Sequence, residues 1–126
     1  LLLNPTDEHV LNNYSYYLSL RKEQLVKAAG MSKQLVDKFP KEGTYLDTYA
    51  WVLYQPGEFA EALRYLDRAV ADEESQSSAV WEHHGDTLFR LGRIREAVSS
   101  WEKAKALPNA SQNLDKKIKM RQIVEN

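Results

Sequence analysis

Two stretches of this chain share one skeleton, although most of their residues differ: LYQPGEFAEALRYLDRA at residues 53–69 and LFRLGRIREAVSSWEKA at residues 88–104. Each places Leu, an aromatic residue, Gly, a bulky apolar residue, Glu-Ala and a closing Ala in the same order. Equivalent positions, such as Gly57 and Gly92, are 35 residues apart. A repeat of this length predicts a supersecondary unit that buries its apolar face by stacking on neighbouring units.

Each copy of the repeat reads as two helices. Apolar residues between 46 and 53 recur at i, i+3, i+4 and i+7, which is the stripe of one helix face. Pro56-Gly57 ends that helix, because Pro lacks an N–H and Gly accepts a left-handed conformation. A second stripe follows over residues 59–70, and Leu91-Gly92 separates two helices in the next copy. No segment alternates apolar and polar residues with a period of two, so the sequence predicts an all-α fold without strands.

The spacing also divides the chain into units. A weaker copy stands on the N-terminal side, where Leu11 and Leu18 precede Leu46 and Leu53 by 35 residues. Residues 1–7 read as the tail of a further repeat upstream, so we expect the chain to be part of a longer protein. The predicted units are the upstream tail at 1–7, a degenerate first repeat at 8–42, a second at 43–77, a third at 78–109 and a capping helix at 110–126.

This skeleton resembles the tetratricopeptide repeat (TPR), a pattern of about 34 residues that runs from a bulky residue through Leu-Gly to Ala, an aromatic residue, Ala and Pro. The third unit matches it at Trp81, Gly85, Leu88, Ala97, Trp101, Ala104 and, one place early, Pro108. The second unit carries Glu74 where the Pro would stand, and the first inverts large and small residues at Ser32 and Leu35. The resemblance implies a right-handed superhelix of about three helical hairpins and a capping helix. Residues 10–19 and 45–66 are similar to bacterial members.

Composition excludes several classes of function. The chain has 126 residues, a formal net charge of −1 and no Cys. It therefore has no overall positive field for nucleic acid, and no disulfide or Cys-based zinc site. No apolar run reaches the ~20 residues of a membrane-spanning helix. The basic cluster at residues 115–121 is expected to be a solvated helix face, opposite a narrow apolar stripe at Leu114, Ile118, Met120 and Ile123. Nothing in the sequence indicates a cell compartment.

The pair His83-His84 is the one candidate for catalysis or metal binding. Adjacent helix residues point about 100° apart, whereas a two-histidine zinc site on one helix needs i, i+4 spacing. We therefore expect His84 to be a hydrogen-bonded core residue and His83 to face the groove between the repeats. A metal site or a hydrolase centred on this pair is the least favoured interpretation, and the sequence predicts neither a cofactor nor an enzyme.

The resemblance implies that the first helix of each unit lines a concave groove that binds another protein. Aromatic and amide side chains there supply contact area and hydrogen bonds for a peptide. The candidate groove residues are His9, Asn12, Asn13, Tyr16, Thr44, Asp47, Thr48, Trp51, Tyr54, Glu82, His83, Asp86, Phe89 and Arg90. The expected function is protein–protein interaction, as a scaffold or adaptor region. The alternative is a purely structural role, in which the repeats extend or cap a larger array and bind nothing themselves.

The groove composition also indicates the partner. TPR domains that bind a free carboxylate use Lys and Asn at fixed groove positions, where this chain has Asn12 and Tyr16. Asp47, Glu82 and Asp86 make the predicted groove acidic. We therefore expect a neutral or basic peptide or helix, rather than a free acidic C-terminus, and no nucleic acid or membrane span. Weak self-association through the N-terminal face is a further expectation.

Overall fold

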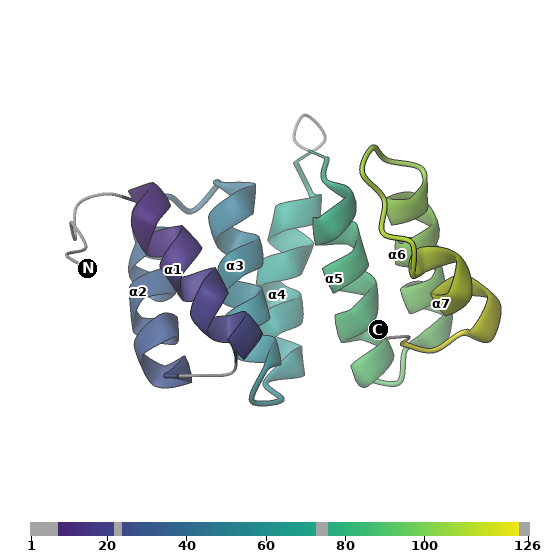
Figure 1. Cartoon of the computed structure of the whole chain (residues 1–126), viewed down its shortest axis with the longest axis horizontal. Helices are drawn as coiled ribbons and strands as arrows, with labels where there is room; N and C mark the ends of the chain where they lie inside the picture. Colours follow the sequence, from purple (N-terminus) through teal and green to yellow (C-terminus); the bar gives the residue numbers. More distant parts are fainter. Residues whose placement is uncertain (1–7, 22–23, 73–75, 124–126) are drawn as a thin grey trace.

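The computed structural model describes residues 8–21, 24–72 and 76–123, which form seven α-helices and no strand within those ranges (Figure 1). The helices are α1 (Glu8–Arg21), α2 (Leu25–Lys38), α3 (Gly43–Tyr54), α4 (Phe59–Val70), α5 (Ser78–Arg90), α6 (Ile94–Lys105) and α7 (Leu114–Met120). They pair as three helical hairpins, α1–α2, α3–α4 and α5–α6, that follow one another along the molecule, and α7 packs on α6. The predicted all-α fold of three helix pairs and a C-terminal helix is confirmed.

Glycine ends the first helix of the second and third hairpins. Gly57 has φ +91°, its N–H donates to the Tyr54 carbonyl, and the Glu58 N–H donates to the Leu53 carbonyl. Gly92, with φ +81°, closes α5 through the corresponding two bonds. This arrangement satisfies carbonyls that a helix end leaves free, and it needs a residue that tolerates positive φ. The predicted role of these glycines is therefore confirmed.

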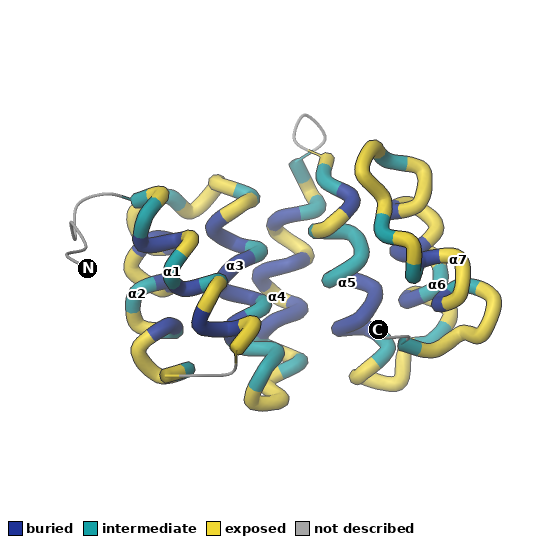
Figure 2. Tube along the Cα trace, viewed as in Figure 1, coloured by how far each residue is buried: buried dark blue, intermediate teal, exposed yellow. Residues whose placement is uncertain are grey.

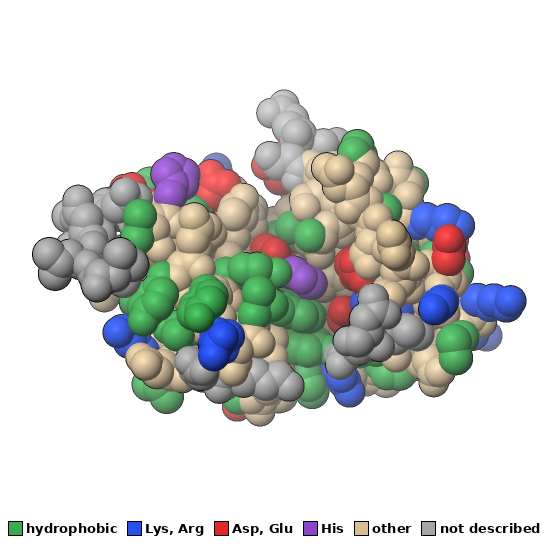
Figure 3. Space-filling model, viewed as in Figure 1, with side chains coloured by type: hydrophobic (Ala, Val, Ile, Leu, Met, Phe, Trp, Pro, Cys, Tyr) green, Lys and Arg blue, Asp and Glu red, His purple; other side chains and the backbone are tan. Residues whose placement is uncertain are grey.

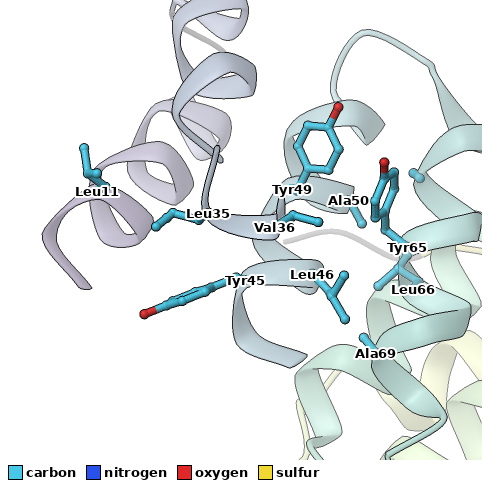
Figure 4. Packing of buried hydrophobic residues seen from close by; sticks show 11 residues of the cluster. Leu11, Leu35, Val36, Tyr45, Leu46, Tyr49, Ala50, Tyr65, Leu66 and Ala69 are labelled. Carbon is cyan, nitrogen blue, oxygen red and sulfur yellow. The ribbon is translucent and has the colours of Figure 1, made fainter. Parts of the chain in front are cut away.

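The apolar stripes meet in two main clusters. The larger lies among α1 to α4 and centres on Leu46, Ala50, Ala62 and Leu66, each at most 1% exposed (Figure 4). The second joins α4 to α5, α6 and α7 around the fully buried Trp101. Buried positions recur along every hairpin (Figure 2), as the helical stripes predict.

Small residues allow the helices of a hairpin to approach closely. A Cβ added at Gly85 would lie 2.5 Å from the Trp101 ring and 3.0 Å from the Ala97 carbonyl oxygen. Gly85 therefore has no room for even a methyl group. Trp81, at the bulky position that begins the third unit, is only partly buried. Its Nε1 donates to Gln76, and the Lys103 ammonium lies 4.6 Å from its ring centroid.

The prediction of an upstream repeat tail rests on residues 1–7, which lie outside the described residues. No helix in the part of the chain that the structure describes is long and apolar enough to cross a membrane.

Candidate functional site

Three stacked rings join the second and third hairpins on the side formed by the first helices. The ring centroid of Trp51 lies 4.2 Å from that of Tyr54 and 3.9 Å from that of His83, at interplanar angles of 18° and 17°. Tyr54 is one helical turn from Trp51 on α3, whereas His83 comes from α5. Two rings at these distances cannot share one face of the indole. Tyr54 and His83 therefore cover its opposite faces.

Polar bonds hold both ends of this ring stack. His83 Nδ1 and Asp47 Oδ1 are 2.8 Å apart, and Arg90 Nε donates to the Tyr54 hydroxyl at 3.0 Å. Figure 3 shows hydrophobic side chains gathered over α1 and α3, with acidic and histidine side chains at the boundary towards α5. The result is a half-buried aromatic surface whose main charged groups are already paired.

The charges around His83 favour its imidazolium form. Burial alone would lower the pKa of His83, but the hydrogen bond and charge of Asp47, with the charges of Asp86 and Glu82, raise it above the ordinary value. Tyr16 on α1 lies in the field of the same carboxylate. Burial, and then the Asp47 charge, raise the pKa of the Tyr16 hydroxyl, which keeps it neutral and able to donate.

Lys117 of α7 neutralises the acidic end of the predicted groove. Its Nζ donates to Glu82 Oε2 at 2.6 Å and to the two oxygens of Asp86 at 3.0 and 3.2 Å. Asp86 is only 6% exposed and also accepts from Trp101 Nε1 at 3.0 Å. The prediction that residues 115–121 form a solvated basic face is therefore wrong for Lys117, which is 4% exposed.

Burial and pairing act in opposite directions on this network. Burial raises the pKa of Asp86, and Lys117 offsets only part of that rise. Burial would lower the pKa of Lys117, but Asp86 and Glu82 outweigh it, so the pKa is raised and the ammonium stays charged. Sequence reasoning missed Lys117, although its spacing of 35 residues from Glu82 was a signal that could have found it.

Three predicted groove residues are buried instead. Asp86 belongs to the network of Lys117, and Asn12 and Thr48 are 6% and 3% exposed. Asn12 lies on α1, which packs against α3, and Thr48 lies on α3, which has neighbouring helices on both sides. The Oδ1 atom of Asn12 has no hydrogen-bond partner among the described residues.

The other candidates remain accessible to different degrees. Tyr16, Asp47, Trp51, Tyr54, Glu82, His83 and Phe89 are half-buried, whereas His9, Asn13, Thr44 and Arg90 are exposed. Thr44 and Asp47 line an open cavity of about 280 Å³ between the start of α3 and the start of α5. Phe89 and Arg90 line another of about 370 Å³ with Gln122 and Ile123. The structure thus gathers residues of α3 and α5 around the ring stack, while His9 lies apart against Tyr45.

His84 is a buried, hydrogen-bonded residue, as predicted. Its Nδ1 lies 2.8 Å from Ser100 Oγ and its Nε2 lies 2.8 Å from Asp67 Oδ1. Both ring nitrogens are therefore engaged with the protein. Within the described ranges, no three His, Asp or Glu side chains are grouped as a metal site would require.

Neither a protein-family model nor a curated protein matches the chain by sequence. Solved structures do match it by fold. The first TPR domain of human RPAP3 is 18% identical with a TM-score of 0.80, over 94% of this chain and 91% of that one. The Sgt2 TPR domain of Aspergillus fumigatus is 19% identical with a TM-score of 0.80, over 92% of this chain and 77% of that one.

A third similar structure is the first TPR of Spaghetti (RPAP3) bound to the HSP90 peptide SRMEEVD. It is 17% identical with a TM-score of 0.80, over 94% of this chain and 95% of that one. The repeat skeleton of the sequence and these structural matches agree, so the chain has the fold of a tetratricopeptide-repeat domain.

Proposed function

We propose that this chain is a protein-interaction module that binds a peptide or helix in the groove along α1, α3 and α5, and that it has no catalytic role. The ring stack of Tyr54, Trp51 and His83 carries the proposal, because it is a half-buried aromatic surface shared by two hairpins. Rigid aromatic groups supply contact area at low entropic cost. The peptide bound to the Spaghetti TPR domain supports a peptide as the kind of partner.

The paired charges indicate a neutral or weakly basic partner. Lys117 bonds to Glu82 and Asp86, and His83 bonds to Asp47, so three carboxylates share one lysine and one histidine and one negative charge stays unmatched even with His83 protonated. Lys117 is buried and therefore unavailable to a ligand carboxylate. Among the described groove residues, no lysine is free to bind the carboxylates of an acidic peptide such as SRMEEVD. We therefore expect that peptide not to bind.

The test is selection of binders from a random displayed peptide library on the immobilised full chain, followed by calorimetric titration. Trp51→Ala should weaken the selected peptides at least about tenfold, or 1.4 kcal/mol, and leave the helical circular dichroism unchanged. Arg64→Ala on α4, whose side chain is 70% exposed, is the matched control and should bind as the wild type does. Asp47→Lys should weaken basic peptides more at low salt than at high salt.

Each failure has a defined meaning. If Trp51→Ala unfolds the chain, Trp51 is a core residue and its assignment to a binding surface is wrong. If the library yields no binder, or if binders are indifferent to Trp51→Ala, the purely structural role is the better account.

A further inference from the structure

We propose that Glu82 and Asp86 form an ammonium pocket that docks a lysine-bearing amphipathic helix, and that α7 is this chain's own occupant of that pocket. The inference rests on the proposed function, because the pocket lies at the α5 end of the same groove. The inference adds the chemical class of the partner. That partner is a helix carrying a Lys, with a Leu three residues before the Lys and an Ile directly after the Lys.

The pocket is built by α5 and α6 without help from α7. Glu82 and Asp86 are four residues apart on α5, so their carboxylates emerge on one helix face. Asp86 is held in place by Trp101 Nε1 at 3.0 Å, and Trp101 is 0% exposed in the core between α5 and α6. The Asp86 carboxylate is therefore held in place independently of α7, and Glu82 lies one turn before it on the same helix.

The ammonium of Lys117 fits this pocket closely. It bonds to both carboxylates, and its side chain is only 5% exposed beside 15% for Glu82 and 8% for Asp86. A buried charge is tolerated only when it is paired and hydrogen-bonded. A cation stabilises the buried carboxylate of Asp86 and the half-buried carboxylate of Glu82, and a lysine presented from the side of α6 supplies it.

Apolar contacts on either side of Lys117 define the rest of the recognition pattern. Leu114 is 1% exposed and Ile118 packs on the same cluster as Trp101. Arg121, at φ 54° and ψ 43°, then reverses the chain, and the Gln122 N–H donates to the Lys117 carbonyl. This turn brings Ile123 to the hollow that Phe89 and Arg90 line on α5 (Figure 1 shows the chain returning towards α5).

α7 has little helical stability of its own. It has seven residues, fewer than the ~12–15 that an isolated helix needs in water. Its outer side is exposed, and its contact with α6 through the ion pair of Lys105 and Asp115 is exposed as well. Such an element opens locally while the remainder stays folded. A partner helix with the same pattern can then take its place.

The experiment uses the full chain and a fluorescent peptide of residues 111–123, SQNLDKKIKMRQI, as the probe. Wild-type protein should bind it weakly, because its own α7 competes at an effective concentration on the order of millimolar. Lys117→Met keeps the side-chain volume and removes the charge, so its pocket should bind the peptide at least about tenfold more tightly by anisotropy. Lys116→Met, at an exposed position of α7, is the matched control and should behave as wild type. A peptide with Met in place of the lysine at 117 should lose the gain.

A folded Lys117→Met protein that binds the peptide no better than wild type overturns the proposal, as does equal binding of the two peptides. If Lys117→Met does not fold, hydrogen exchange of the wild type decides: excess peptide should accelerate exchange in α7 and leave α5 protected. Unchanged α7 exchange would then refute displacement. None of these outcomes depends on a peptide binding at Trp51, so this proposal and the proposed function can fail separately.

Discussion

At the scale of the residue, side-chain volume decides how closely two helices pack. Gly85 and Trp101 are a complementary pair, because the indole ring occupies the space that any Cβ at 85 would need. Trp101 in turn fixes Asp86, so one close contact in the core positions the buried carboxylate that Lys117 binds. Core packing and groove chemistry are therefore linked through a single indole.

Substitution of two helical glycines by alanine should give opposite results. Gly85→Ala should lower the free energy of unfolding by about 1–3 kcal/mol, because the methyl group collides with Trp101 and the Ala97 backbone. Gly30→Ala, in α2, meets nothing within 4 Å and should raise it by about 0.5–1 kcal/mol, since alanine is the better helix former. Urea denaturation of both variants measures the difference. Stabilisation by Gly85→Ala would show that the α5–α6 packing described above is wrong.

The raised pKa of His83 makes stability depend on pH. A group whose pKa is higher in the folded state contributes its full stabilisation below the unfolded value of ~6.5 and loses it as pH rises through the folded value. His83→Phe keeps a ring for the stack and cannot titrate. The stability advantage of the wild type over this variant should therefore be largest in acid and shrink towards alkaline pH.

Urea unfolding of both proteins at several pH values gives that difference directly. The carboxylates of Asp47, Glu82 and Asp86 and the ammonium of Lys117 are present in both proteins, so much of their own titration cancels. An advantage that stays constant across the range would show that His83 does not gain a proton on folding.

At the scale of the element, the ends of helices are set locally and their docking is set by neighbours. Gly57 and Gly92 end α3 and α5 by the same pair of backbone bonds in two different sequence contexts. The short helix α7, by contrast, has little intrinsic stability and owes its place to Leu114, Lys117 and Ile118.

Removal of residues 110–126 should lower the melting temperature and promote aggregation. It uncovers the apolar cluster around Trp101 and leaves Glu82 and Asp86 without their cation, a loss of at least about 3 kcal/mol. Met120→Ala, at a residue that is 55% exposed on α7, should change little. Calorimetry compares the two, and an unchanged melting point in the truncated chain would mean that α7 is not docked in solution.

At the scale of the whole molecule, the fold is a row of hairpins in which each contacts mainly its neighbours. The large cluster of α1 to α4 and the cluster around Trp101 are separate, and they are joined by the contact of α4 with α5 and by the ring stack between α3 and α5. The stability of such an array is close to a sum over units and their interfaces.

Native-state hydrogen exchange should therefore be slowest in the central hairpin. α3 and α4 have packed neighbours on both sides, whereas α7 packs mainly on α6 and reaches α5 through Lys117 within the described residues. Amides of α3 and α4 should open with the largest free energy, and those of α7 with the smallest. Equal protection from α1 to α7 would instead indicate a single cooperative unit.

The sequence alone determined the fold, because the repeat skeleton combines local signals that act over one or two helical turns. The stripe around Leu46, the glycine at 57 and the small residue at 85 each specify a helix face, a helix end or a close approach. Most groove residues could also be placed on their helix by counting. The burial of His84 followed from its position in the stripe.

Only the tertiary structure decided which charges are free and which rings are covered. Lys117 is far from Glu82 and Asp86 in sequence, and its long side chain reaches them because α7 docks beside α5 and α6. Trp51 has both faces covered because α5 brings His83 against it. Helical periodicity fixes the direction of a side chain from its own helix, whereas pairing and burial depend on what the next hairpin places opposite it.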